Sequence, residues 1–195
     1  MNTDLLLTAF LQKKHLFALV DAARTFGLPK FLTGRPMPGQ ATRLGAKGCI
    51  QCLYDGKSAH DLRDFAPYLV EIGGENAVLK SLLENGWGQA WGLWFSCPLP
   101  FAEVRKHLRR FLVVKVEGEA DMFFRFYDPR VLRVYLPTCT EAERKDVFGP
   151  ITELFMEDED PSTCLVMRNS PRGLVTERIP PELRGAMTSQ KYLKL

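Results

Sequence analysis

Two periodicities of apolar residues divide the chain into expected strands and helices. Short apolar runs that are bounded by charged residues or by proline predict buried strands. In the first half of the chain these runs are residues 15–21, 49–54, 67–72 and 90–96. Apolar residues that recur three or four positions apart predict helices at 3–13, 75–85 and 101–111, with a short helix capped by Ser58.

The second half of the chain continues this alternation. Residues 112–117 and 122–127 predict a hairpin. Asp128 and Pro129 predict a helix start, because aspartate is a favoured N-cap and proline is tolerated at the first helical position. Thr140 and Glu143 predict a capping box for the next helix. Further strands are expected at 151–156, 164–168 and 174–179, followed by a short polar helix near 182–190.

This order of elements predicts an α/β (mixed α+β) fold in which helices flank a mixed sheet. Apolar density falls after Pro137, so we divide the chain into an N-terminal lobe, residues 1–137, and a smaller C-terminal lobe, residues 138–195. Residues 24–48 are rich in glycine and proline, which predicts a long loop or an insertion whose role the sequence does not indicate.

Composition narrows the functional classes. The 195 residues are 46% hydrophobic and carry a formal net charge of +3, a near balance that argues against nucleic acid as a partner. Five cysteines are an odd number and a poor disulfide framework, which favours a reducing compartment. No apolar run approaches the ~18–20 residues of a membrane span, and no secretory signal is evident. We therefore expect a cytoplasmic protein with no membrane partner.

Signatures of catalysis and of bound cofactors are missing from the sequence. The three histidines belong to no metal-binding spacing, and there is no nucleophile elbow or phosphate-binding loop. Cys49 and Cys52 form a C-x-x-C pair, but within a strand their side chains face opposite sides of the sheet. We interpret them as buried structural thiols, and we expect no catalytic residue, no cofactor and no metal.

Three groups of residues are candidates for binding a partner. The tryptophans Trp87, Trp91 and Trp94 belong either to the core or to a partly exposed aromatic groove. Arg105, Arg109 and Arg110 form a basic ridge on the expected helix 101–111, which is either a solvated face or a contact for an acidic partner.

The third group follows the expected hairpin and is the most specific. Arg125 and Tyr127 should share a strand face, Asp128 should cap the next helix, and Arg130 should lie in its first turn. The arginines either pair with Asp128 and fix the turn, or offer guanidinium groups to a partner.

The order of several motifs resembles the effector chaperones, or adaptors, of bacterial type VI secretion systems. The resemblance covers about residues 15–150. It is carried by Leu16 to Ala23, Leu53-Tyr54-Asp55-Gly56, Ala66 to Val70, Trp87-Gly88, Trp91-Gly92, Leu108 to Phe111 and, most specifically, Phe124 to Leu132.

This resemblance implies a non-enzymatic function. Such proteins bind a toxic effector in the producing cell and help to load it onto the VgrG spike, and the more variable C-terminal lobe is implied to help select the cargo. Two alternatives remain open at this point. One is a small hydrolase with a site assembled from Asp128, His107 and Arg125, and the other is a nucleic-acid-binding module.

Overall fold

The computed structural model describes residues 3–25, 42–44, 48–73, 76–114 and 122–180. Eight strands form one sheet in the order β10-β9-β8-β5-β1-β4-β3-β2, and β6 and β7 form a separate two-stranded ribbon. The strands are β1 (Leu16–Asp21), β2 (Thr42–Leu44), β3 (Gly48–Cys52), β4 (Pro67–Glu71), β5 (Gly92–Ser96), β6 (Val113–Val114), β7 (Met122–Phe123), β8 (Glu153–Glu157), β9 (Cys164–Ser170) and β10 (Gly173–Ile179).

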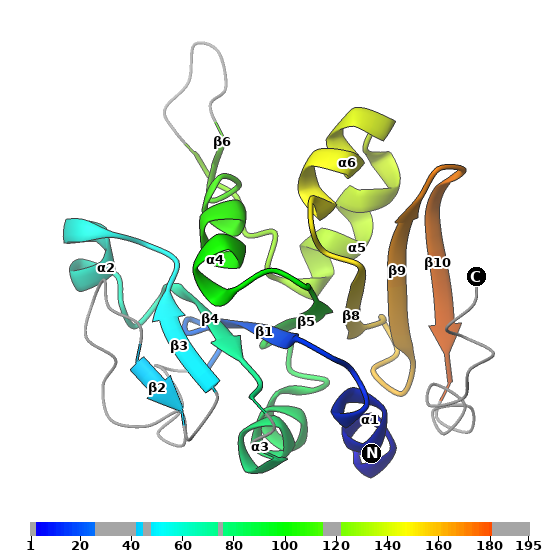
Figure 1. Cartoon of the computed structure of the whole chain (residues 1–195), viewed down its shortest axis with the longest axis horizontal. Coiled ribbons are helices and arrows are strands. Elements are labelled where there is room, and N and C mark those ends of the chain that lie inside the picture. Colours follow the sequence, from blue (N-terminus) through cyan, green and yellow to red (C-terminus); the bar gives the residue numbers. More distant parts are fainter. Residues whose placement is uncertain (1–2, 26–41, 45–47, 74–75, 115–121, 181–195) are drawn as a thin grey trace.

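Helices cover both faces of this sheet (Figure 1). They are α1 (Asp4–Leu11), α2 (Gly56–Asp61), α3 (Asn76–Gly86), α4 (Phe101–Arg109), α5 (Pro129–Thr138) and α6 (Glu141–Phe148). On one face α1 packs beside α3, and on the other lie α4, α5 and α6. The mixed α+β class is confirmed, with the capping box at Thr140 and the cap at Asp128 as expected.

The sheet differs from the expected mixed arrangement because every pairing between its described strands is antiparallel. A parallel pair needs a crossover connection of about a dozen residues or more, and the short turns that join β8 to β9 and β9 to β10 permit only antiparallel pairing there. The helix expected to start at Ser58 begins earlier, at Gly56, and Asp55 is its N-cap residue.

Two expectations fall partly or wholly outside the described residues. The segment 24–48 was expected to lack regular structure, but its residues Thr42–Leu44 form β2 against β3. The polar helix expected near 182–190 lies outside the described residues. The boundary between the expected lobes, 137/138, falls at the last residue of α5, and the strands that follow it, β8 to β10, extend the same sheet.

The core has two halves, one on each face of the central strands. Trp94 of β5 and Phe155 of β8 are paired neighbours that both contact Phe10 of α1. The next residue of β5, Phe95, stacks on Phe17 of β1 on the opposite face. The alternation of Trp94 and Phe95 thus serves two separate apolar layers. Among the described residues, no helix is both long and apolar enough to cross a bilayer.

Gly92 is required where β5 begins. A Cβ atom at this position would lie 1.8 Å from the carbonyl oxygen of Leu19 on β1, which is a backbone clash that no side-chain movement can relieve. The preceding residue, Trp91, accepts a hydrogen bond from the Asp21 amide through its carbonyl group. The glycine therefore lets β5 approach β1 at the point where Asp21 ends that strand.

Candidate functional site

The most specific motif of the sequence folds as a strand end, a turn and a helix cap. The strand β7 ends at Phe123, and the amide of Asp128 donates to the carbonyl oxygen of Arg125 at 3.0 Å. Arg125 and Tyr127 therefore lie in a turn, and the expectation that they share a strand face is wrong. The hydrogen-bonded turn ends the strand early and directs Phe126 into the core, where it contacts Phe111 edge to face.

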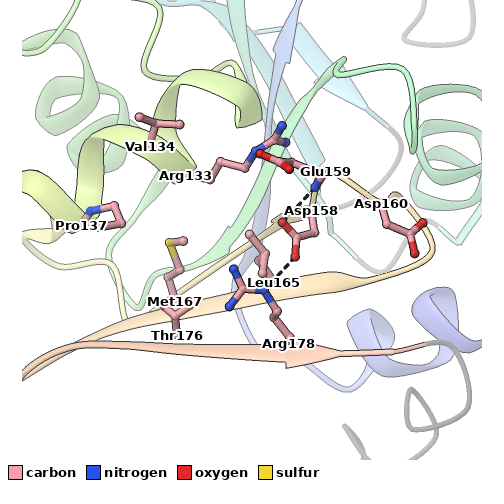
Figure 2. Close-up of a pocket in the computed structure, with 10 residues that line it drawn as sticks. All are labelled: Arg133, Val134, Pro137, Asp158, Glu159, Asp160, Leu165, Met167, Thr176 and Arg178. Atoms are coloured by element: carbon pink, nitrogen blue, oxygen red, sulfur yellow. Dashed lines mark hydrogen bonds and ion pairs between the residues drawn. The ribbon is translucent and has the colours of Figure 1, made fainter.

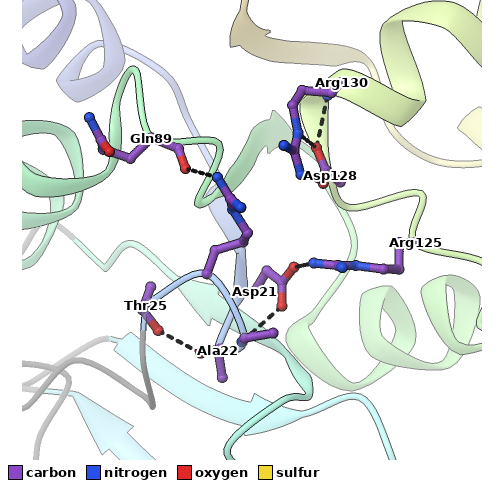
Figure 3. A network of polar contacts seen from close by, with 9 residues as sticks. Asp21, Ala22, Thr25, Gln89, Arg125, Asp128 and Arg130 are labelled. Carbon is purple, nitrogen blue, oxygen red and sulfur yellow. Dashed lines mark hydrogen bonds and ion pairs between the residues drawn. The ribbon is translucent and has the colours of Figure 1, made fainter.

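Arg125 pairs with a carboxylate that lies 104 residues away in sequence. Its guanidinium forms an ion pair with Asp21, which ends β1 and is 0% exposed (Figure 3). The other oxygen of Asp21 accepts a hydrogen bond from the Ala23 amide at 3.0 Å. Burial raises the pKa of the Asp21 carboxyl, and Arg125 and the amide act in the opposite direction. Arg125 thus ties the signature turn to the central strand of the sheet.

Asp128 and Arg130 form a second pair at the start of α5. One oxygen of Asp128 accepts from both the backbone amide of Arg130 at 3.0 Å and its Nε at 2.9 Å. Burial opposes ionisation of Asp128, but these bonds outweigh it and lower its pKa. The expected pairing with Asp128 is therefore present for Arg130, whereas Arg125 uses Asp21. We call Asp21, Arg125, Asp128 and Arg130 the charged corner.

Tyr127, the remaining member of this group, is buried beside the charged corner. Its hydroxyl shares a hydrogen bond with that of Tyr54, and burial raises the pKa of both phenols. The ring of Tyr127 also meets Phe126 edge to face at 5.6 Å. Tyr127 is a packing residue in this structure.

The basic ridge on α4 is also engaged within the protein. Arg105 and Arg109 share the carboxylate of Asp55, and Arg110 pairs with Asp146 of α6. Arg105 Nε further donates to the carbonyl oxygen of Cys52 at 2.9 Å. These contacts fix α4 against β3 and α6. Because two guanidinium groups share one carboxylate, one positive charge at this end of α4 is not balanced by Asp55.

The tryptophans divide between core and surface. Trp87 and Trp94 are buried with ring centroids 5.3 Å apart, and the Trp87 indole donates to the carbonyl oxygen of Pro161 at 2.6 Å. Trp91 is half-buried and lines an open depression of about 730 Å³ beside Arg24 and Gln89. Of the three tryptophans, Trp91 has the most surface with which to meet a partner.

The sequence analysis did not identify the apolar surface on the ribbon of β6 and β7. Val113, Val114, Met122 and Phe123 are between 41% and 58% exposed. Val113 is opposite Phe123 and Val114 is opposite Met122, so the pairs point to opposite faces of the ribbon. We call these four residues the apolar ribbon. The sequence does contain a signal for this surface. In the short predicted hairpin, consecutive residues are apolar, so neither face of the ribbon is polar.

The apolar ribbon adjoins both groups of charged residues. The ring of Phe123 lies 5.6 Å from that of Tyr54, whose neighbour Asp55 holds Arg105 and Arg109. Two residues after Phe123, Arg125 enters the charged corner. Exposed apolar groups that are surrounded by charged side chains are typical of a surface for protein binding.

The three groups of the hydrolase alternative have separate partners. His107 is buried on α4, where its Nε2 lies 3.0 Å from the carbonyl oxygen of Val147 and burial lowers its pKa. Asp128 binds Arg130, and Arg125 binds Asp21. Arg125 and Asp128 influence each other through their charges, but no hydrogen bond or ion pair joins these three described side chains to one another. The arrangement therefore offers no acid and base in hydrogen-bond contact.

The C-x-x-C pair is split across β3 as expected. Cys52 lies on the buried face, where burial raises the pKa of its thiol to about 11, and Cys49 lies half-buried on the other face. Cys49 donates its hydrogen bond to Glu71. None of the five cysteines forms a disulfide in the described residues. Within the described part of the chain, no three metal-ligating side chains gather.

The fold and the site define an α+β protein whose most distinctive surface is apolar and lies next to internally paired charges. The family model of a domain of unknown function, DUF4123, matches residues 16–146, and the chain belongs to this family. The match ends within α6, so it contains the charged corner, the apolar ribbon and the basic helix α4. No curated protein and no solved structure matches the chain.

Proposed function

We propose that this protein is a non-enzymatic adaptor that binds a type VI secretion effector in the cytoplasm and helps to load it onto the VgrG spike. Membership of the DUF4123 family supports this proposal, together with the resemblance of the signature motif to the effector chaperones of these systems. The C-terminal lobe, residues 138–195, is proposed to contribute to the choice of effector.

The apolar ribbon is the observation that carries the proposal. A two-stranded ribbon alone is marginally stable in water, and this one exposes apolar side chains on both faces. The charged side chains of the neighbouring motif are paired within the protein, so they are not poised to act on a small substrate. A protein partner that covers the ribbon would bury apolar area, which is the main source of affinity in protein association.

Co-expression with a type VI secretion effector and a VgrG protein from the same organism tests the proposal. We expect a complex that survives size-exclusion chromatography at micromolar concentration. A double substitution in the ribbon, Val114→Ser with Met122→Ser, should remove the complex and leave the melting temperature within a few degrees, because both side chains are exposed. If neither protein forms a complex with the unmodified chain, the adaptor function is refuted.

A turnover assay separates the adaptor from an enzyme. The purified chain should not hydrolyse ester, peptide or glycosidic substrates at a rate that depends on Asp128, His107 or Arg125. Turnover that is lost in a variant of one of these residues with an unchanged fold would overturn the adaptor interpretation.

A further inference from the structure

The apolar ribbon lies between two groups of guanidinium side chains. On one side, the ring of Phe123 lies 5.6 Å from that of Tyr54, whose carbonyl oxygen accepts a hydrogen bond from Arg105 at 3.2 Å. On the other side, Arg125 follows Phe123 by two residues and lies close enough to Tyr54 to influence it through its charge. Tyr54 thus joins the exposed ring of Phe123 to both groups.

The arginines on α4 carry more charge than the carboxylate that holds them. Arg105 and Arg109 both form ion pairs with Asp55, so two guanidinium groups share one carboxylate and the group has one net positive charge. The Arg109 side chain is 37% exposed, and it meets Asp55 through Nη1. A guanidinium group has five N–H donors. The exposed side of Arg109 therefore has donors left for a second carboxylate.

The ion pair of Arg125 also has its cation at the surface. Asp21 is completely buried, whereas the Arg125 side chain is 42% exposed. Only Nη2 of this guanidinium donates to Asp21, and its other nitrogen atoms have no hydrogen-bond partner among the described residues. The carboxylate thus lies below the surface while N–H donors of the arginine face solvent. Both groups beside Phe123 therefore present positive charge.

The surface near the last strands of the sheet has the opposite balance of charge. A groove of about 590 Å³ between α5 and the strands β9 and β10 is lined by the carboxylates of Asp158, Glu159 and Asp160 and by the guanidinium groups of Arg133 and Arg178 (Figure 2). Carboxylates outnumber guanidinium groups in this groove, whereas they are outnumbered beside the ribbon. Positive charge next to exposed apolar side chains is therefore a local property of the ribbon.

We propose that the apolar ribbon binds an acidic amphipathic segment of the effector. Apolar side chains of that segment pack on Met122 and Phe123, and its carboxylates pair with Arg109 and Arg125. Complementary charges at the edge of an apolar contact steer association and fix its register. This inference rests on the proposed adaptor function and names the chemistry of the partner. The effector is the occupant because, in that function, the adaptor binds it before the spike is engaged.

Photo-crosslinking of the full chain identifies the bound segment. A benzophenone amino acid replaces Phe123, and the chain is co-expressed with the effector and VgrG. We expect a crosslink to the effector, and mass spectrometry should locate it in a stretch where aspartate and glutamate outnumber lysine and arginine. The control is the same replacement at Phe65, an exposed phenylalanine outside the ribbon, which should give no crosslink.

Removal of the unbalanced charge tests the ionic contacts. Arg109→Gln leaves Arg105 to neutralise Asp55, so the melting temperature should be kept, whereas a substitution of Arg125 would leave the buried Asp21 without its partner. At about 50 mM salt the variant should bind the effector about threefold more weakly, the size of a charge effect at an interface rim. The difference should vanish at about 500 mM salt, because ions screen exposed charges.

Arg178→Gln is the matched control for this charge removal. Arg178 is also an exposed arginine that pairs with a carboxylate, since its Nε donates to Asp158 at 2.9 Å in the groove near the last strands (Figure 2). This variant should bind the effector as the unmodified chain does at both salt concentrations.

The outcomes separate this inference from the adaptor function. A crosslink from position 123 to VgrG, a crosslink to an effector stretch without an excess of acidic residues, or an intact complex with no crosslink refutes the acidic effector segment and leaves the adaptor function standing. Unchanged affinity of Arg109→Gln at low salt, or a loss that persists at high salt, refutes the ionic contacts in the same way. The absence of any complex refutes the adaptor function and this inference with it.

Discussion

The charged corner and the apolar ribbon are formed by neighbouring residues but have opposite surroundings. Asp21 and Asp128 are almost completely buried, and each has an arginine partner. Met122 and Phe123, a few residues earlier, are about half exposed. The comparison shows that the charged residues of the corner are paired within the fold, whereas the apolar residues of the ribbon lie at the surface.

Burial explains this division of roles. A carboxylate that is removed from water is costly unless a charged partner compensates it, so Asp21 restricts where Arg125 can lie. An exposed apolar side chain costs little stability in the free protein and contributes when a partner covers it. Substitutions in the corner should therefore change folding first, and substitutions in the ribbon should change binding first.

The largest expected effect is on Asp21. Asp21→Ala removes the partner of Arg125 and the acceptor of the Ala23 amide, which should reduce the free energy of unfolding by about 3 kcal/mol. Urea denaturation measures this loss. Asp21→Asn is the control, since its amide oxygen can still accept from Ala23, and it should be less damaging. At a temperature where the variant is folded, its affinity for the partner should stay within about twofold of the original. An unchanged unfolding midpoint would contradict the structural role of the corner.

Phe123 should show the reverse behaviour. Phe123→Ser should weaken the complex about tenfold, because truncation of a central aromatic residue at an interface typically costs more than 1 kcal/mol. The melting temperature should change little, since the ring is 58% exposed. The matched control is Phe65→Ser, at an exposed phenylalanine outside the ribbon. Equal affinity of both variants, measured by isothermal titration calorimetry, would exclude the apolar ribbon as the binding surface.

Local features of the corner were predictable from sequence, whereas its long-range pairing was not. Asp128 as a cap before Pro129 follows from local preferences, and the structure confirms it. The partner of Arg125 depends on the sheet, which brings the end of β1 to the signature turn. With only the sequence, the nearest carboxylate was Asp128, so the pairing was assigned to it.

The exposed ribbon illustrates a second limit of sequence patterns. Apolar residues in a short hairpin predict burial, and the position of a hairpin outside the main sheet is decided by the packing of all other elements. Trp94 shows the converse case, because its place in an apolar run correctly favoured the core. The antiparallel sheet was missed because alternating strands and helices are also the pattern of a parallel sheet.

Asp128 allows the cap and the ion pair to be separated. Asp128→Ala removes both and should cost about 1–2 kcal/mol of unfolding free energy. Asp128→Asn keeps a good capping group and loses the charge, so it should cost less than about 1 kcal/mol, since the Arg130 side chain is 48% exposed and its pair is partly screened by water. Chemical denaturation of both variants gives the two values. If Asp128→Asn lowers the free energy of unfolding as much as Asp128→Ala does, the ion pair contributes more to stability than the cap. Arg130 would then be as important to the fold as Arg125.

His107 is a buried titratable group outside the corner, and it gives the smallest expected effect. Its ring contacts the Val147 carbonyl group and the edge of Phe111, with Arg110 and Asp146 as the nearby charges. Burial lowers its pKa from the usual 6.5, so the unfolded chain binds a proton that the folded chain does not. Stability is therefore fully present above pH 6.5 and decreases as the pH falls toward the folded pKa. Between pH 8 and pH 6 the loss should be at most about 0.8 kcal/mol.

His107→Gln should remove this part of the pH dependence of stability. The variant should keep the loss of stability below pH 4.5, which arises from the lowered pKa values of Asp128 and Glu153. The same slope between pH 8 and pH 6 in both proteins would show that His107 is not the group responsible.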